Sequence, residues 1–268
     1  MRNLLRRTFY LTMVSSVSLL NASSVQADEA GVPTSPESFH LYLLIGQSNM
    51  AGRGVVEDQD RVPHPRVLMF TKDEQWAPAT DPIHFDKTIA GVGLGSTFGR
   101  VMADADPSIT VGLIPCAVGG TPLSRWQKDG DLYQQAVVRA KAAMQKGTLK
   151  GILWHQGESE SGSAERSGNY CERLSGMVTD LRTELQSPDV PFVAGELGRF
   201  LAKVKNDKPS YWPVVNEQLH LLPMRISKSS IVSSEGLSHK GDDVHFDSPS
   251  LREFGRRYAK AMQKLQTP

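Results

Sequence analysis

The chain has 268 residues, of which 39% are hydrophobic and 22% charged, and 30 Lys and Arg against 29 Asp and Glu leave a net charge of +1. At roughly 100 to 200 residues per domain, this length allows one large or two small domains with a sizeable core. The composition is that of an ordinary globular protein, which excludes fibrous and membrane-embedded proteins. The lack of a long block of like charges argues against a nucleic-acid partner.

Residues 1–27 are typical of a secretory signal peptide. Three arginines precede a mostly apolar stretch at 8–20, and small residues stand where a signal peptidase inspects the chain, up to Ala27. As a helix the apolar stretch extends only about 20 Å, against the roughly 30 Å hydrocarbon core of a bilayer, so an uncleaved anchor is the weaker alternative. We expect cleavage after Ala27, a single domain at 28–268, secretion or export to the periplasm, and no stable membrane partner.

Short apolar runs alternate with helical patterns along the rest of the chain. Five runs have the length and content of strands buried on both faces, and they lie at 41–45, 111–114, 152–154, 192–194 and 230–232. Helices are expected at 97–105, 131–145, 170–186 and from 248 to the C-terminal end, the last with a capping box from Ser250 to Glu253. This alternation predicts an α/β fold, a three-layer sandwich with a central, mainly parallel five-stranded sheet. The segments 52–90 and 199–213 are expected as long loops that face a substrate.

Two cysteines remain after the expected cleavage, Cys116 and Cys171. Export would place them where disulfides persist, and a bridge would stabilise the chain by about 4 kcal/mol in the chain-entropy model. Cys116 follows an apolar run, so a buried free thiol at a strand end is an equal alternative.

Three of the expected strands are followed by residues suited to chemistry, and ligands bind beyond the carboxyl ends of parallel strands. Ser48 follows the first strand on a sharp turn, as a nucleophile needs, although a helix cap is its alternative role. Gly119 and Gly120 follow the second, where a backbone N–H can approach a ligand closely or simply form a turn. Gln156 follows the third, with an amide that can donate to an oxyanion or hold a neighbouring loop.

A histidine far along the chain has two neighbouring carboxylates. Asp242 stands three residues before His245 and can reach the second ring nitrogen, which fixes the tautomer that a general base needs. Asp243 is the competing partner, but its spacing of two residues points it away. The alternative role of His245 is an ordinary surface histidine.

Four motifs follow one another along the chain, namely Gly46-Gln47-Ser48-Asn49-Met50, Val118-Gly119-Gly120-Thr121, Trp154-His155-Gln156-Gly157-Glu158 and Asp242-x-x-His245-Phe246. In this order they closely resemble the SGNH-hydrolase superfamily, and within it the sialate O-acetylesterase-like group that includes acetyl xylan esterases of carbohydrate esterase family 6. The resemblance covers about 39–264.

The resemblance implies a serine esterase of the SGNH fold, with Ser48 as nucleophile, His245 as general base and acid, and Asp242 as its orienting carboxylate. It also implies an oxyanion hole made of the backbone N–H of Ser48, that of Gly119 or Gly120, and the amide of Gln156. Gln156 departs from the wider superfamily, which has Asn there.

The same resemblance implies an acetylated polysaccharide or oligosaccharide as the substrate. The motif around Ser48 lacks the Gly-Asp-Ser-Leu of lipolytic relatives, which favours the carbohydrate branch. Arg125, Trp126 and Glu158 are candidate substrate contacts.

Two other functions stay open. One is a carbohydrate-binding protein that has lost catalysis, although Ser48, Asp242 and His245 are all intact. The other is a hydrolase of short-chain lipid esters or thioesters, against which the polar character of 52–90 argues. Neither a metal nor a cofactor is expected, because zinc signatures are missing and the Gly-rich 91–96 follows no convincing strand.

Overall fold

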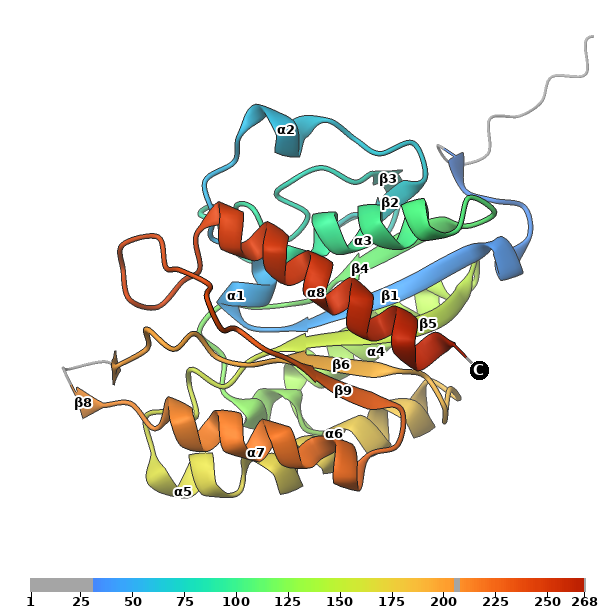
Figure 1. Cartoon of the computed structure of the whole chain (residues 1–268). Helices are drawn as coiled ribbons and strands as arrows, with labels where there is room; N and C mark the ends of the chain where they lie inside the picture. Colours follow the sequence, from blue (N-terminus) through green and yellow to red (C-terminus); the bar gives the residue numbers. More distant parts are fainter. Residues whose placement is uncertain (1–30, 205–207, 268) are drawn as a thin grey trace, which may run out of the picture.

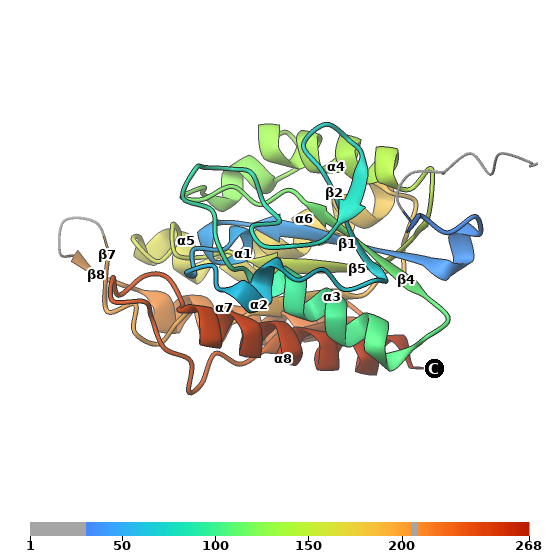
Figure 2. The ribbon, with the colours of Figure 1, turned by 90° about the horizontal axis from the view of Figure 1, so that it is seen from above.

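A central sheet covered by helices on both faces organises the chain (Figures 1 and 2). This computed structural model describes residues 31–204 and 208–267. The expected signal peptide at 1–27 lies outside the described residues.

The main sheet has seven strands in the order β3-β2-β4-β1-β5-β6-β9. Neighbours are parallel except β2 and β3, which are antiparallel. The strands are β1 (Phe39–Gly46), β2 (Val67–Phe70), β3 (Trp76–Pro78), β4 (Thr110–Pro115), β5 (Thr148–His155), β6 (Phe192–Gly195) and β9 (Ser229–Val232). All five expected strands are present, as β1, β4, β5, β6 and β9, and the α/β fold with a mainly parallel sheet is confirmed.

The strand count differs from the expected five because two short strands at one side of the sheet, β2 and its outer neighbour β3, lie inside 52–90, which the sequence indicates as a loop. β2 is a run of only four residues, and it becomes a strand by pairing in parallel with β4. β3 then pairs with β2. Such short strands depend on pairing with a neighbour, which for β2 is the distant β4, so their own residues give little signal.

Two groups of helices cover the two faces of the sheet. They are α3 (Leu94–Ala105) and α8 (Ser248–Gln266) on one face, and α4 (Asp131–Ala143), α6 (Tyr170–Glu184) and α7 (Trp212–Arg225) on the other. Figure 2 shows α4 and α8 on opposite sides of the strands. Successive residues of β1 point to opposite faces, so Tyr42 and Leu44 pack on the α3 and α8 side while Leu43 and Ile45 pack on the other. Both faces of β1 are therefore core.

The helix boundaries correct three expectations. α3 begins at Leu94, three residues before the expected start at 97, so the second half of the Gly-rich 91–96 lies inside the helix. α8 begins at Ser248, and the side chain of Asp247 accepts the N–H of Ser250 at 2.8 Å, so the capping box expected from Ser250 to Glu253 is wrong. α7 was not expected. The shorter elements are η2 (Pro36–Ser38), α1 (Ser48–Ala51), α2 (Asp58–Arg61), η3 (Leu123–Trp126), α5 (Ala164–Gly168), β7 (Lys203–Val204) and β8 (Lys208–Pro209).

The two cysteines are not paired. Cys116 follows β4, Cys171 lies buried in α6, and both thiols are free. Of the two alternatives drawn from the sequence, the free thiol therefore holds. Separately, none of the helices in 31–204 and 208–267 has the length and hydropathy that a membrane-spanning helix needs.

Candidate active site

The carboxyl ends of three adjacent strands bring the three central motifs together. β1 lies between β4 and β5, so the segments that follow these strands leave the sheet side by side. The N–H of Gln47, after β1, donates to the carbonyl of His155 at 2.8 Å, and the N–H of Val118, after β4, donates to the carbonyl of Gly46 at 3.0 Å. The sheet edge expected to bind a ligand is therefore tied across all three strands.

Ser48 is held on a tight turn at the end of β1. Gly46 has a φ of +133°, and a Cβ there would overlap the carbonyl oxygen of His155, so only glycine fits. The chain then enters α1, whose N-cap is Gln47 and whose first residue is Ser48. The N–H of Ser48 thus has no acceptor within the helix. Ser48 is therefore the first residue of α1 and not its N-cap, so the alternative role of Ser48 as a helix cap is wrong.

A chain of hydrogen bonds links Ser48 to His245 and Asp242. The Nε2 atom of His245 lies 3.0 Å from the Oγ atom of Ser48, although the two residues are 197 positions apart. The Nδ1 atom of His245 lies 2.7 Å from the Oδ2 atom of Asp242. Figure 1 shows the basis of this meeting, since the loop that leads into α8 lies beside α1. The three residues singled out in the sequence are in hydrogen-bonding contact.

The carboxylate of Asp242 is tied into its own loop. Its Oδ1 atom accepts the N–H of His245 at 2.8 Å and that of Val244 at 3.1 Å. Partial burial acts to raise the pKa of Asp242, but these bonds and the one from the His245 ring outweigh it and lower the pKa to about 2. Asp242 is therefore a carboxylate at neutral pH. Asp243 has a φ of +55° and lies 3.3 Å from the Nε2 atom of His239, away from His245.

Gly119 lies against the serine, but its N–H is already bound. A Cβ on Gly119 would lie 3.3 Å from the Cβ of Ser48 and would overlap the guanidinium of Arg53. The N–H of Gly119 donates to the Oδ2 atom of Asp86 at 2.8 Å. Gly120 has a φ of +78°, and its N–H has no acceptor within 31–204 and 208–267. Of the two glycines, Gly120 is therefore the one with a free N–H.

Arg53 and Asp86 form a buried ion pair beside the serine. Their side chains are 2% and 1% exposed, and Nη2 of Arg53 lies 2.6 Å from Oδ2 of Asp86. Burial acts to raise the pKa of Asp86, yet the bonds from Arg53 and Gly119 outweigh it and hold that pKa below its usual value. Sequence reasoning missed this pair. Both residues lie in 52–90, where nothing in their spacing indicates that they meet.

The structure contradicts the expected role of Gln156 in an oxyanion hole. The side chain is fully buried, and its Nε2 atom donates to the carbonyl of Thr121 at 3.1 Å and to Oε2 of Glu160 at 2.9 Å. Its Oε1 atom accepts the hydroxyl of Tyr170 at 2.9 Å. Both amide hydrogens are used inside the protein, so Gln156 holds a neighbouring loop, which is the alternative left open by the sequence.

The three candidate substrate contacts all have partners within the protein. Arg125 forms a bidentate pair with Asp131 at the surface, with distances of 2.9 and 2.5 Å. Trp126 is 1% exposed and packs edge-on against Trp154 in the core, because its indole is large and apolar. Glu158 is buried, where its Oε1 atom accepts the side chain of Asn49. Trp126 and Glu158 are therefore enclosed in the protein, whereas Arg125 lies at the surface, bound to Asp131.

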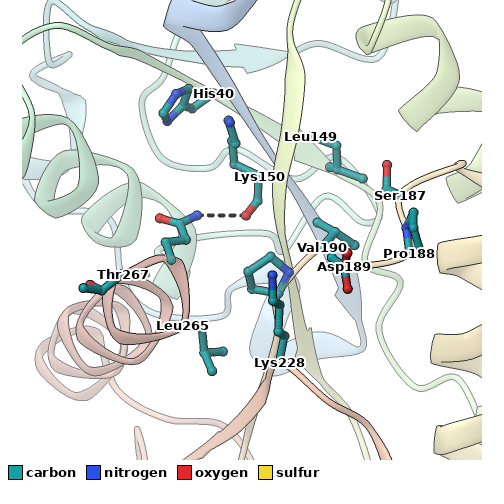
Figure 3. Close-up of a pocket in the computed structure, with 12 residues that line it drawn as sticks. His40, Leu149, Lys150, Ser187, Pro188, Asp189, Val190, Lys228, Leu265 and Thr267 are labelled. Atoms are coloured by element: carbon teal, nitrogen blue, oxygen red, sulfur yellow. Dashed lines mark hydrogen bonds between the residues drawn. The ribbon is translucent and has the colours of Figure 1, made fainter.

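A pocket of about 810 Å³ lies at the amino ends of the sheet's strands (Figure 3). Its lining includes His40 at the start of β1, Lys150 in β5 and Lys228 before β9. These are the amino ends of the strands, opposite the end that carries Ser48. The pocket therefore contributes no residue to the hydrogen-bonded chain.

The arrangement suits nucleophilic chemistry at a carbonyl. A serine hydroxyl, an imidazole and a carboxylate in sequence can transfer a proton from the hydroxyl as it attacks. Within 31–204 and 208–267, no group of three or more His, Cys, Asp or Glu residues is placed to hold a metal ion.

Comparisons with known proteins agree with this chemistry. Residues 38–264 match the family described as "Carbohydrate esterase, sialic acid-specific acetylesterase". The chain is 28% identical to the "Probable carbohydrate esterase At4g34215" of Arabidopsis thaliana over 82% of this chain and 89% of that one. It is 23% identical to the "Probable 9-O-acetyl-N-acetylneuraminic acid deacetylase" of Escherichia coli K12, over 60% of this chain and 68% of that one.

Solved structures show the same fold. The X-ray structure of the Arabidopsis protein matches with a TM-score of 0.76 at 27% identity, covering 85% of this chain and 99% of that one. The crystal structure of NanS matches with a TM-score of 0.71 at 19% identity, covering 86% and 98%. Because the family match spans most of the chain, the protein belongs to the sialic acid-specific acetylesterase family of carbohydrate esterases and is a carbohydrate acetylesterase, a carboxylic ester hydrolase.

Proposed function

We propose that this protein is a secreted esterase that removes O-acetyl groups from sugars, with Ser48 as the nucleophile. The observation that carries the proposal is the hydrogen-bonded chain from Ser48 through His245 to Asp242, with contacts of 3.0 and 2.7 Å. A binding protein without catalysis would have no need to hold these three groups in register, which disfavours that alternative.

In the first step, the Oγ atom of Ser48 attacks the acetyl carbonyl carbon while Nε2 of His245 takes its proton. The hydrogen bond from Nδ1–H of His245 to Asp242 keeps Nε2 free to accept and stabilises the imidazolium that results. His245 then gives the proton to the departing sugar oxygen, and an acetyl-Ser48 ester remains.

In the second step, water attacks the acetyl-enzyme with the same proton transfers, which releases acetate and restores Ser48. In both steps the carbonyl oxygen becomes an oxyanion. We assign its donors to the backbone N–H groups of Ser48 and Gly120, since that of Gly119 binds Asp86. Loss of one such donor lowers the rate by roughly 100- to 1,000-fold.

We propose an O-acetylated sialic acid as the substrate, in line with the family description and with the name of the E. coli relative. Acetylated xylan, the substrate of carbohydrate esterase family 6, is the second candidate, which rests on the resemblance of the motifs. Parallel assays of acetate release from the two materials separate the candidates.

The test of the nucleophile is Ser48→Ala. We expect it to abolish hydrolysis of a chromogenic acetate ester while leaving the thermal transition nearly unchanged, because one small hydroxyl carries little of the folding energy. Retention of more than about a hundredth of the wild-type kcat contradicts covalent catalysis by Ser48.

The proposal of secretion rests on the sequence of 1–27 alone. Expression of the full chain in a bacterial host, followed by N-terminal sequencing of the exported protein, tests it. We expect a mature chain that begins at Asp28. An exported or retained chain that still begins at Met1 contradicts it.

A further inference from the structure

We propose that Asn49 is a positioning residue that holds the His245 loop against the turn carrying Ser48. This inference rests on the proposed function, because it concerns how the two reacting side chains are brought into register. Asn49 directly follows Ser48 in α1 and is 1% exposed. Its amide points away from the solvent and toward the loop between β9 and α8.

The amide of Asn49 binds the backbone on both sides of His245. Its Oδ1 atom accepts the N–H of Phe246 at 3.1 Å, and its Nδ2 atom donates to the carbonyl of Val244 at 3.1 Å. One side chain thus holds the peptide groups that precede and follow the histidine. The Cα atom of His245 is held between two bonds that both originate one residue from Ser48.

The hydrogen bonds between Asp242 and His245 do not fix the position of the loop relative to Ser48. Asp242 belongs to the same loop as His245, so it orients the imidazole within the loop but does not fix the loop relative to Ser48. The 3.0 Å contact between Nε2 of His245 and Oγ of Ser48 depends on where the whole loop lies. Apart from that contact, Asn49 supplies the side-chain hydrogen bonds that join the loop to the serine turn within 31–204 and 208–267.

Glu158 determines which way the Asn49 amide faces. Its Oε1 atom accepts the second N–H of Nδ2 at 2.5 Å, and its side chain is buried. With the amide reversed, Oδ1 would face the carboxylate of Glu158 and the carbonyl of Val244, and all three bonds would be lost. The motifs around Ser48 and Glu158 therefore cooperate to hold a third motif, the one around His245.

Packing of Phe246 is the competing explanation for the position of the loop. Its ring contacts those of His155, Phe200 and Phe254, with centroids 5.8, 5.0 and 5.3 Å away. If this packing alone places His245, loss of the Asn49 amide lowers stability without lowering turnover. The two explanations therefore differ in a measurable way.

The test compares Asn49→Ala with Asn216→Ala. Asn216 is a matched control because it is also buried and its amide also binds backbone, accepting the N–H of Leu197 at 2.8 Å and donating to its carbonyl at 3.2 Å. Both variants lose a buried amide with two backbone bonds. Turnover of an acetate ester is measured per mole of folded protein, together with KM and the thermal transition.

We expect both variants to unfold at lower temperature, but only Asn49→Ala to lose kcat, by about 10- to 100-fold with KM nearly unchanged, because a reacting group misplaced by 1 Å costs on the order of 100-fold. In a His245→Ala background, Asn49→Ala should change the residual rate less than about twofold, since the group it positions is gone. A kcat for Asn49→Ala within about twofold of wild type, an equal loss in Asn216→Ala, or an undiminished effect in the His245→Ala background overturns the proposal.

A second variant keeps the test decisive if Asn49→Ala does not fold. Asn49→Asp has the same shape but places a carboxylate against Glu158. We expect Asn49→Asp to lose kcat and the added substitution Glu158→Gln, which restores a donor between the two groups, to recover part of it. No recovery, with the double variant folded, overturns the proposal. Failure of the proposed function has a different signature, which is esterase activity that survives Ser48→Ala.

Discussion

Asp81 is a buried carboxyl group whose ionisation should set the pH dependence of stability. It lies between β3 and α3, is 4% exposed, and accepts the N–H of Gly93 at 3.4 Å. Burial raises the pKa of Asp81 to about 7 from 3.8, and the hydrogen bond from Gly93 and the charge of Arg100 offset this only in part. The negative charge of Asp60 acts in the same direction as burial.

The sign of the effect follows from the two pKa values. Between them the unfolded chain carries an ionised Asp81, while the folded protein keeps the group protonated. Rising pH therefore stabilises the unfolded state, and the free energy of unfolding falls until the pH passes the folded value of about 7. At about 1.4 kcal/mol per pH unit, the loss between about pH 5 and pH 8 is on the order of 3 kcal/mol.

The variant Asp81→Asn removes this loss, because an amide mimics the protonated acid and does not ionise. Its free energy of unfolding relative to wild type should rise by about 3 kcal/mol from about pH 5 to pH 8, measured by denaturant unfolding at each pH. Asp73→Asn, at an exposed site, is the control and should give the same difference from wild type at both values. An Asp81→Asn difference that does not change with pH refutes a carboxyl group held neutral by burial.

Three further outcomes follow from the site. Asp242→Asn should lower kcat by several orders of magnitude because the amide stabilises the wrong tautomer of His245, whereas Asp243→Asn should be mild; the opposite ranking moves the assignment to Asp243. Asp86→Ala should lower the free energy of unfolding by about 3 to 5 kcal/mol, since it leaves the guanidinium of Arg53 buried without a partner; a loss below about 1 kcal/mol argues that water reaches the pair. If the site is built for acetate, hydrolysis should fall steeply from acetate through butyrate to octanoate esters, because a recess of that size rejects longer acyl chains by overlap, and equal or higher activity on octanoate favours a lipid hydrolase.

Much of the architecture follows from local patterns. The runs that form β1, β4, β5, β6 and β9 are apolar because their strands are buried on both faces, so they stand out in the sequence. β2 does not, because its four residues become a strand only through pairing with β4. The contact between Asp242 and His245 was predictable for the same reason as the central strands, since a spacing of three residues within one loop fixes it locally.

Other features of the site depend on contacts that no local pattern reports. Gln156 follows a strand at the ligand-binding edge, yet its amide faces Glu160 and the carbonyl of Thr121, which only the packed structure reveals. Trp126 is an aromatic residue near the site that packs into the core instead. A side chain's type indicates what it can bind, but its direction is decided by neighbours from elsewhere in the chain.

The sequence by itself therefore determined the fold class, the serine turn after β1 and the pairing of Asp242 with His245, because each depends on residues close together in the chain. No local pattern places His245 against Ser48 across 197 positions, which the sequence indicated only through the family resemblance of its motifs. The tertiary structure alone decided that Asn49 spans the same gap and that Arg53 pairs with Asp86 beside the serine. These contacts form only when the sheet and both helix layers are packed, since their geometry is set by burial and by the order of the strands.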